Sequence, residues 1–371
     1  MVGLIVTTLA WKVLGATFLL PDDRHPGSMA VSDFHQRAST WRPKPVISPD
    51  GWLPAGLRDR FGTLPPQDPL FAVSLRIVEP FRRLFSVGGS WHSCFYFLIG
   101  GVLNVGIWSF CGAAITRSSV MHCGLHTRIS LQETLVFAKE QCFAIFSAVI
   151  LPLVGITLLA IPFIALGWLM TLDIGIFIAG LLWVFVLFAG CLMAVLGLGL
   201  MFGWPLMWGC ICAEKSDAFD AISRSYAYTF QRPLHYLFYA LIAAVLGTLG
   251  WLVVWWLSES AIALSYWSVE LGSGAVRIEP LREFVDGARP IDELGGPMIC
   301  GIRLIQLSNG AVRCLASAYA YSFFWSVSGA VYLLLRRDTD QTELDDVICQ
   351  TPRITTPMAS ATASSVPSET T

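Results

Sequence analysis

The chain has 371 residues, of which 55% are hydrophobic and 13% are charged, and its formal net charge is −2. Soluble domains carry about 25% charged residues, because their surfaces face water. Half of that charge, combined with apolar runs of about 20 residues, is typical of a protein that crosses the lipid bilayer several times. A nearly neutral chain also lacks the basic surface that binds nucleic acid, and we expect no nucleic-acid partner.

Ten cysteines lie singly along the chain, mostly in or beside apolar runs, where a free thiol behaves as a small hydrophobe. There is no CxxC pair, and Cys210 and Cys212 are close neighbours only as Cys-x-Cys. His122, Cys123 and His126 have a spacing that could hold a metal ion, but no fourth ligand is near, and solvated loop histidines are commoner. From the sequence we therefore assign no metal, no cofactor and no catalytic residue.

The N-terminal segment, residues 1–20, is the first apolar run, and we interpret it as a transmembrane anchor. No basic segment precedes it and no small-residue cleavage site follows it, so we expect it to be uncleaved; its abrupt start suggests a coding start further upstream. Residues 21–70 are rich in proline and are predicted to form an extended extracytoplasmic linker. Residues 71–85 show apolar and charged positions at helical spacing, which indicates an interfacial helix or, alternatively, a soluble helix on a small cap.

Five further apolar runs follow, at residues 94–116, 142–170, 174–212, 235–257 and 315–335. Together they predict an all-α fold, a polytopic membrane helical bundle with about six transmembrane helices and amphipathic interfacial helices. Ser130 and Glu133 form a capping box that starts a short helix before the third span. The run 174–212 is about 58 Å long as one helix, against a membrane core of about 30 Å. We expect one long span that breaks near Gly199, Gly203 and Pro205; a half-span that folds back is the alternative.

Residues 203–240 form a compact charged segment between two apolar runs. The side of the membrane on which this segment lies determines the side assigned to the other polar segments. Ser216 is positioned to cap a helix over residues 217–230, whose favourable first turn contains two aspartates. An i, i+4 ion pair and an aromatic face make this helix an amphipathic elbow on the membrane surface. The candidate functional residues of the elbow are Glu214, Asp217, Asp220, Arg224 and Arg232. A divalent ion and an anionic head group could meet there, but capping and ion pairing explain the same residues, and we favour the structural interpretation.

Six spans place both termini on the same side of the membrane. Loops 117–141 and 204–234 and the pair Arg336-Arg337 share one side. The positive-inside rule assigns this side to the cytoplasm because of its basic residues, namely Arg117, Arg128, Lys139, Lys215, Arg224 and Arg232. This puts both termini in the cytoplasm and the acidic segment 258–312 outside, although arginines 76, 82 and 83 beside the second span count against it. The predicted domains are the anchor 1–20, the linker 21–70, a helical transmembrane domain 71–337 and a cytoplasmic tail 338–371, acidic and then Ser/Thr-rich and disordered.

The predicted span interiors carry little chemistry. Those of the second to sixth spans contain no Asp, Glu, Lys, Arg or His, and Lys12 of the first span is the lone charge. Ion-coupled carriers keep such groups within their spans, so this pattern argues against a proton-driven carrier. No phosphate-binding loop, zinc-protease motif or nucleophile elbow occurs.

We expect a non-enzymatic membrane scaffold or assembly partner that contacts the lipid bilayer and other membrane proteins. The alternatives are a facilitator-type transporter or export component for a small solute and, third, a membrane-embedded lipid-modifying enzyme.

Four sequence segments are similar to those of a known family: CGAAITRSSVMH at 111–122, ISLQETLVFA at 129–138, DAFDAISRSYAYTFQRP at 217–233 and SFFWSVSGAVYLLLRRDTDQTELDDV at 322–347. Over residues 70–347 they resemble an uncharacterised family of polytopic integral membrane proteins of planctomycete-type bacteria. The elbow is similar, more loosely, to the membrane domain that accompanies bacterial glycerophosphodiesterases, but the similarity does not extend to their catalytic domain. The resemblance implies a helical bundle in a bacterial inner membrane, and it implies no activity and no site residues.

Overall fold

The computed structural model describes residues 1–18, 73, 77, 80, 81, 91–285, 295–344 and 347. The regular structure of these residues is helical, with α1 (Val2–Phe18), α5 (Trp91–Leu125), α6 (Leu131–Leu169), α7 (Asp173–Glu214), α8 (Ala218–Gln231), α9 (Pro233–Ser273), α10 (Ala275–Val285) and α11 (Gly296–Asp340). Five of these helices, α5, α6, α7, α9 and α11, are long and apolar enough to cross a membrane, and α1 is a shorter apolar helix. The chain is therefore an all-α polytopic membrane protein, as its sequence predicts.

The membrane helices are longer than the predicted spans. Helices α6, α7, α9 and α11 contain 39, 42, 41 and 45 residues. At about 1.5 Å per residue each is about twice the thickness of a hydrocarbon core of about 30 Å. These helices must therefore tilt strongly in the membrane or project beyond it.

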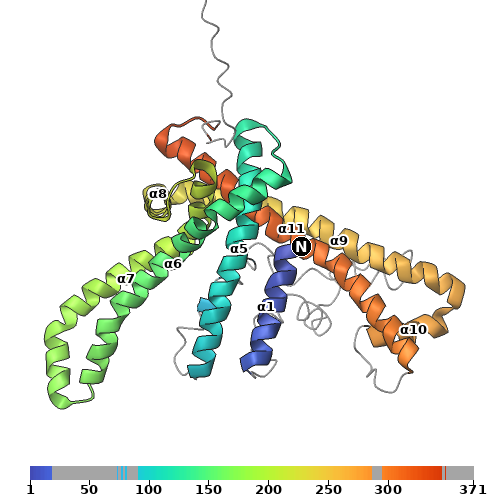
Figure 1. Ribbon diagram of the computed structural model, residues 1–371, viewed down its shortest axis with the longest axis horizontal. Helices are drawn as coiled ribbons and strands as arrows, with labels where there is room; N and C mark the ends of the chain where they lie inside the picture. Colours follow the sequence, from blue (N-terminus) through green and yellow to red (C-terminus); the bar gives the residue numbers. More distant parts are fainter. Residues whose placement is uncertain are drawn as a thin grey trace, which may run out of the picture.

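The long helices meet at one end and diverge at the other (Figure 1). We call the region where the C-terminal ends of α5, α7 and α11 and the N-terminal end of α6 meet, beside α8, the packed end. Helices α6 and α7 leave it as one antiparallel pair, the α6–α7 leg, and α9 and α11 leave it as a second pair, the α9–α11 leg, with α10 at its tip. Helix α5 runs between the legs and carries α1 on its surface.

Stacked tryptophans fill the core near the packed end. The indole rings of Trp208 on α7 and Trp325 on α11 are parallel, with centroids 4.0 Å apart. Gly112 of α5 makes this approach possible, because a Cβ atom there would lie 2.6 Å from the Trp208 ring. Trp108 and Trp204 pack around the same pair of rings. Aromatic rings bury large areas, so this cluster is the main apolar contact among α5, α7 and α11.

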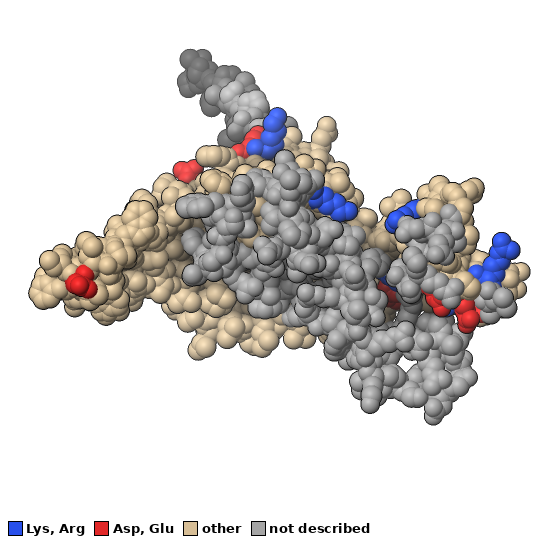
Figure 2. All heavy atoms as spheres, turned by 90° about the horizontal axis from the view of Figure 1, so that it is seen from below, with Lys and Arg blue, Asp and Glu red and all other residues tan. Residues whose placement is uncertain are grey.

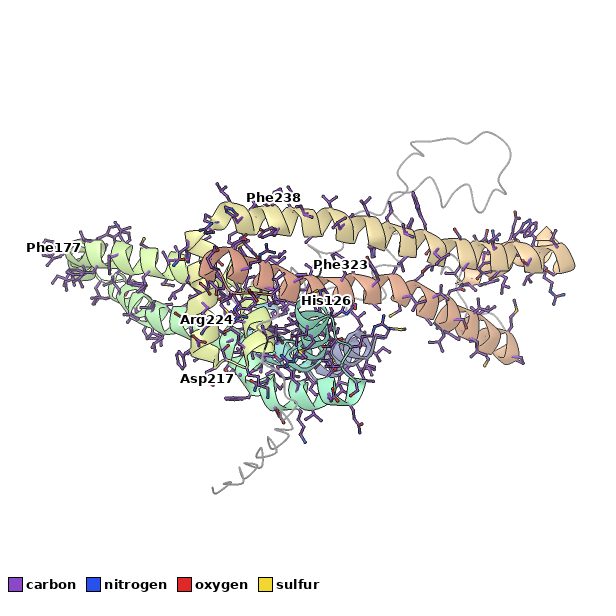
Figure 3. The ribbon with its side chains drawn as sticks, turned by 90° about the horizontal axis from the view of Figure 1, so that it is seen from above. His126, Phe177, Asp217, Arg224, Phe238 and Phe323 are labelled. Carbon is purple, nitrogen blue, oxygen red and sulfur yellow. The ribbon has the colours of Figure 1, made fainter. Side chains whose placement is uncertain are left out.

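The legs leave most of their apolar side chains uncovered by the chain. In the most apolar window of α7 only 6% of the residues are buried, against 50% in the corresponding window of α11. Phe177 projects from the far end of the α6–α7 leg (Figure 3). Charged side chains are sparse on the face drawn in Figure 2, where described residues form the surface. Such surfaces belong in lipid or against other membrane helices.

Two predicted boundaries inside these helices are wrong. The capping box at Ser130 is present, since the Glu133 backbone N–H donates to Ser130 Oγ at 3.2 Å, but the helix that it starts continues without a break through the third span. The expected break near Gly199, Gly203 and Pro205 does not occur, because α7 runs on to Glu214. Proline removes a single backbone hydrogen bond, and the residues that follow Pro205, from Leu206 to Ala213, are buried in the packed end, where the helix remains continuous.

The two glycines instead form the seat of the elbow helix α8. A Cβ atom at Gly199 would lie 1.9 Å from the Tyr226 ring, and one at Gly203 would lie 3.4 Å from Ser225 Oγ. The Tyr226 hydroxyl also donates to the Leu196 carbonyl of α7 at 2.7 Å. Small residues four apart let two helices approach closely in a membrane. The Gly-x-x-x-Gly pattern is therefore a docking groove for α8.

Several predicted segments fall largely outside the described residues. The linker 21–70 and the tail beyond residue 347 lie outside them, and of the interfacial helix predicted at 71–85 the structure describes Val73, Ile77, Pro80 and Phe81, with Val73 and Ile77 buried. Helix α11 extends to Asp340, three residues beyond the double arginine that is expected to end the last span. Leu344 and Val347 then pack against the core near Gly124, so the chain just after α11 returns to the packed end.

The docking groove makes a specific prediction. Gly199→Ala should destabilise the protein by about 1–3 kcal/mol, because the new methyl group displaces Tyr226 and loosens α8. Gly180→Ala in the same helix is the matched control, since a Cβ atom at Gly180 would meet no other atom within 4 Å. The control should be neutral or stabilised by up to about 1 kcal/mol through helix propensity. SDS titration of the purified protein in mixed micelles measures both, and equal effects would refute the groove.

Candidate functional site

A tight turn at the end of α7 brings the elbow residues together. Lys215 adopts the left-handed conformation (φ 53°), and its backbone N–H donates to the Ile211 carbonyl at 2.9 Å, which ends α7 at Glu214. Asp217 is extended (φ −73°, ψ 163°), and α8 begins one residue later at Ala218. The chain therefore reverses within three residues, and α8 starts beside the end of α7 that it follows.

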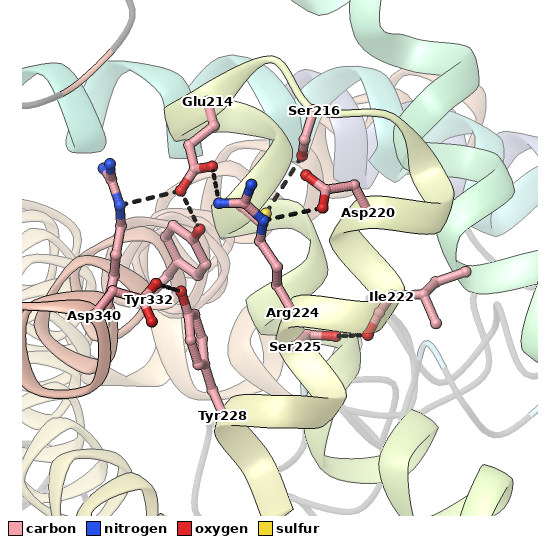
Figure 4. Close-up of polar contacts among 11 residues, drawn as sticks. Glu214, Ser216, Asp220, Ile222, Arg224, Ser225, Tyr228, Tyr332 and Asp340 are labelled. Carbon is pink, nitrogen blue, oxygen red and sulfur yellow. Dashed lines mark hydrogen bonds and ion pairs between the residues drawn. The ribbon is translucent and has the colours of Figure 1, made fainter. Parts of the chain in front are cut away.

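Glu214 is the centre of the ion-pair network at the packed end (Figure 4). Its Oε1 accepts a hydrogen bond from the Tyr332 hydroxyl at 2.5 Å and forms an ion pair with Arg336 Nε at 3.1 Å, while Oε2 accepts a hydrogen bond from Arg224 Nη1. The side chains of Glu214 and Arg336 are 11% and 9% exposed. One nearly buried carboxylate on α7 thus binds α8 and α11 at the same time, and its charge is balanced by two guanidinium groups.

A second layer of contacts widens this network. Arg224 Nε also donates to Asp220 Oδ1 at 3.0 Å, which confirms the predicted i, i+4 pair. The Tyr228 hydroxyl donates to Asp340 Oδ2 at the end of α11, and the Tyr239 hydroxyl of α9 donates to Asp338 Oδ2 at 2.5 Å. These acceptors neighbour one another on the last turn of α11, so α8 and α9 are both tied to that turn.

Arg117 of α5 completes the packed end from the opposite side. Its side chain is buried, and Nη1 donates to the Cys212 carbonyl at 2.6 Å. That carbonyl belongs to the last turn of α7, where the helix dipole favours a positive charge. The guanidinium also lies 4.6 Å from the centroid of the Phe137 ring on α6. One arginine therefore holds α5, α6 and α7 together.

The elbow charges act on the pKa values of their neighbours in α8. Burial lowers the pKa of Arg224, but the hydrogen bond to Asp220 and the charges of Glu214 and Asp220 outweigh it, so this pKa lies above its ordinary value. Burial, and then the bond to Asp340, raises the pKa of Tyr228. Arg224 therefore remains a cation and Tyr228 a neutral hydrogen-bond donor at neutral pH. Both oxygens of Glu214 accept from protein donors, so this carboxylate acts as a structural link between helices.

Three of the five predicted elbow residues meet in this network, namely Glu214, Asp220 and Arg224. Asp217 is exposed, at the N-cap position of α8 but without a side-chain capping bond, and Arg232 is exposed at the junction of α8 with α9. The prediction that Ser216 caps α8 is wrong. Its hydroxyl lies 3.3 Å from Cys210 Sγ, because the turn at Lys215 directs Ser216 back toward α7.

His122, Cys123 and His126 are exposed at the end of α5 and in the loop that follows it. Among the residues that the structure describes, no three His, Cys, Asp or Glu side chains lie close enough to share a metal ion. The geometry therefore brings together no ligand set around this sequence pattern.

The sequence contains a signal for the partners that the elbow prediction misses. Asp220, Arg224 and Tyr228 recur every four residues along α8, and Tyr332, Arg336 and Asp340 recur every four residues along α11. Residues at this spacing share one helix face, so each helix carries a polar stripe. The two stripes meet at Glu214 and through the bond from Tyr228 to Asp340. When Arg336 is interpreted only as the end of the last span, its ion pair with Glu214 is missed.

A second ion pair lies within the α9–α11 leg, outside the charge-free span interiors that the sequence predicts. Arg313 Nε donates to Glu259 Oε1 at 2.7 Å, and Nη2 lies 3.4 Å from Oε2. The side chains are 24% and 12% exposed. The predicted fifth span ends at residue 257 and the predicted sixth begins at 315, so both residues fall just outside. In the structure α9 and α11 continue past them as unbroken helices.

Comparison with known proteins adds no assignment: the chain matches no family model, no curated protein and no solved structure.

The network predicts unequal effects of two isosteric substitutions. Glu214→Gln leaves Arg224 and Arg336 without their shared carboxylate, and we expect a loss of about 3–5 kcal/mol of stability, the usual effect of breaking a nearly buried ion pair. Asp220→Asn is the matched control, because its side chain is 44% exposed and exposed i, i+4 pairs contribute only about 0.5 kcal/mol. Thermal unfolding of both variants in detergent measures the difference. Similar melting temperatures for the two variants would show that Glu214 does not hold the packed end together.

Proposed function

We propose that the protein is a non-enzymatic membrane scaffold or assembly partner. The observation that carries this proposal is the divergence of the α6–α7 and α9–α11 legs from one packed end (Figure 1). A chain whose helices all packed against one another would bury its inner faces. Here α7 exposes large apolar side chains around most of its circumference, for example the four consecutive residues Leu182, Trp183, Val184 and Phe185. Helices arranged in this way have free faces on which other membrane helices can pack.

The elbow supports the same proposal against the lipid-modifying enzyme. Glu214 is occupied by Tyr332 and two arginines, and Asp220 is paired with Arg224. A catalytic acid or base needs hydrogen-bond access to a substrate proton. Two of the three acidic elbow residues, Glu214 and Asp220, therefore hold α7, α8 and α11 in place instead of facing a substrate.

A facilitator-type transporter is the second candidate, and the pair formed by Glu259 and Arg313 favours it. An ion pair inside a membrane helical leg is expensive to build and commonly marks a solute or ion pathway. The scaffold proposal remains first because it rests on both legs, whereas the ion pair belongs to one.

Site-directed photocrosslinking in native membranes tests the scaffold proposal. A photoreactive phenylalanine analogue at Phe188, whose side chain is 76% exposed on α7, should give discrete protein adducts, because a partner helix covers that surface. The same analogue at Phe324, which packs against Trp204 with ring centroids 5.4 Å apart, is the matched control and should give none. A scaffold binds through particular faces, so adducts should appear at some exposed leg positions and not at others. Absence of protein adducts at every exposed position of both legs would show that lipid alone covers them.

We further infer a bacterial inner-membrane location with both termini in the cytoplasm, and membership of the planctomycete-type family that the sequence resembles. The convergence of segments 117–141, 204–234 and 336–347 at one packed end supports the orientation, because these segments carry the basic residues expected on the cytoplasmic side. The inferred family membership rests on the amino-acid sequences of the elbow and of residues 322–347.

Cysteine accessibility in intact cells and in inverted vesicles tests the orientation. In a background without the native cysteines, Asp217→Cys in the elbow should react with a membrane-impermeant maleimide only in inverted vesicles. Ser273→Cys, at the exposed end of α9, is the matched probe and should react only in intact cells. Labelling of both positions from one side would contradict the proposed threading.

A further inference from the structure

The outer face of α7 carries one row of apolar side chains that runs from the tip of the α6–α7 leg toward the packed end. The residues of this row recur alternately three and four positions apart. All of them are exposed, and we call them the α7 stripe: Ile174, Phe177, Leu181, Val184, Phe188, Cys191, Val195, Leu198 and Phe202. The exposed fractions are 72–77% for the five side chains nearest the tip and 43–49% for the three nearest the packed end. The chain therefore leaves this face of α7 open along its whole length.

The opposite face of α7 packs within its own leg. Gly175 and Ala179, which lie off the stripe, are buried near the tip. A Cβ atom at Gly175 would lie 1.7 Å from the carbonyl oxygen of Leu169, at the end of α6. In the view of Figure 1, α6 lies between α7 and α5. The α7 stripe therefore faces outward, and another membrane helix can reach it without entering the space between the legs.

Side-chain size separates the α7 stripe from the rest of the helix. Between residues 174 and 202 the sequence contains no proline and no charged residue. All glycines and alanines of this segment lie off the stripe, at positions 175, 179, 180, 189, 190, 194, 197 and 199. Lipid chains are as apolar as leucine and set no such spacing. A helix that packs lengthwise against another one does need it, because large side chains at this spacing fill the holes of the partner helix.

The alternation of three and four positions gives a repeat of 3.5 residues. This is the spacing with which two helices wind around each other in a left-handed sense, and most helix pairs in membranes cross in that sense. From Ile174 to Phe202 the stripe is about 42 Å long at about 1.5 Å per residue. A bilayer is about 40–45 Å thick with its head-group regions. With the stripe in the bilayer, a helix paired with it makes contact across the whole membrane, and the packed end projects beyond.

The α7 stripe is large enough for a stable contact and is complementary to itself. Side chains with these exposed fractions present on the order of 1,000 Å² in total, and a stable interface needs roughly 800 Å² from each partner. Charges beside such a stripe select one partner helix over another, but the flanking positions here are uncharged, for example Gly180, Phe185 and Leu187. A two-fold contact uses the same surface on both copies. Nothing on α7 between residues 174 and 202 therefore excludes an identical helix.

We propose that the α7 stripe is the contact surface between two copies of this chain, which pair about a two-fold axis with their α7 helices parallel. Copies inserted in the same orientation are related by an axis perpendicular to the membrane. Helix α7 then runs in the same direction in both copies, and each residue of the stripe meets its own counterpart. This inference rests on the scaffold function proposed above and names the partner of that scaffold.

Oxidative crosslinking in native membranes tests the pairing, because Cys191 belongs to the stripe. In a background that keeps Cys191 as its single cysteine, the two thiols of a pair lie face to face. A disulfide forms where the Cα atoms are within about 7 Å, so copper phenanthroline should give a product of twice the chain mass.

The matched control moves the cysteine by one position, off the stripe. It combines Cys191→Ala with Gly190→Cys, where a Cβ atom would meet no other atom within 4 Å. This control should crosslink at least about tenfold more slowly, because its thiol points away from the partner. Leu198→Cys and Gly197→Cys, each in Cys191→Ala, repeat the comparison seven residues further on, with the same expected difference. Equal rates within each pair of positions, or no dimer at 191 and 198, would overturn the pairing.

Photocrosslinking at Phe188 with two differently tagged copies in one cell keeps the native cysteines and separates this inference from the scaffold proposal. An adduct that carries both tags supports the pair. Adducts that join one tagged copy to a different protein, with none that carries both tags, would overturn the pairing and leave the scaffold proposal standing. Absence of protein adducts at Phe188 and at every other exposed leg position would overturn both.

Discussion

A nearly buried carboxylate between two arginines constrains the whole packed end. A carboxylate that is only 11% exposed, as in Glu214, is costly to bury unless its oxygens are bonded, and its partners Arg224 and Arg336 come from two other helices. Satisfying one carboxylate therefore fixes where α8 and α11 meet the end of α7. Arg117 does the same from the other side, through the carbonyl of Cys212 and the ring of Phe137. The tryptophan cluster contributes apolar area, and the charges determine which helices share it.

The legs follow from this arrangement. The ion pairs and hydrogen bonds of Glu214 and Arg117 lie at one end, and beyond them α6 and α7 diverge from α5 (Figure 1). In the α9–α11 leg, by contrast, Glu259 and Arg313 hold the two helices together far from the packed end. The two legs thus differ in kind. The first is an apolar hairpin suited to packing against lipid or partner helices, and the second has an ion pair between its two helices.

The sequence predicts the class of fold because composition and apolar run length report directly on the membrane. It also predicts the pairing of Asp220 with Arg224, since neighbours at i, i+4 are fixed by helix geometry alone. The partners of Glu214 are not predicted because they lie 10 and more than 100 residues away along the chain, and only packing brings them close. Gly199 and Gly203 suggest a break because a glycine pattern on one helix does not reveal which helix docks on it. Glu259 and Arg313 are missed since the predicted spans end at the expected membrane thickness.

The central role of Glu214 is tested most directly by a double-mutant cycle between Glu214 and Arg336, measured by SDS titration of Glu214→Gln, Arg336→Gln and the double variant. If the carboxylate joins α7 to α11, the effects of the two substitutions on stability should be strongly non-additive, with a coupling free energy of about 1–3 kcal/mol. Either substitution alone already breaks the ion pair between Glu214 and Arg336, so the second has less left to remove. Additivity to within about 0.5 kcal/mol would mean that the two side chains do not act together. The packed end would then rest on its tryptophans and on Arg117, and the central role given to Glu214 would be wrong.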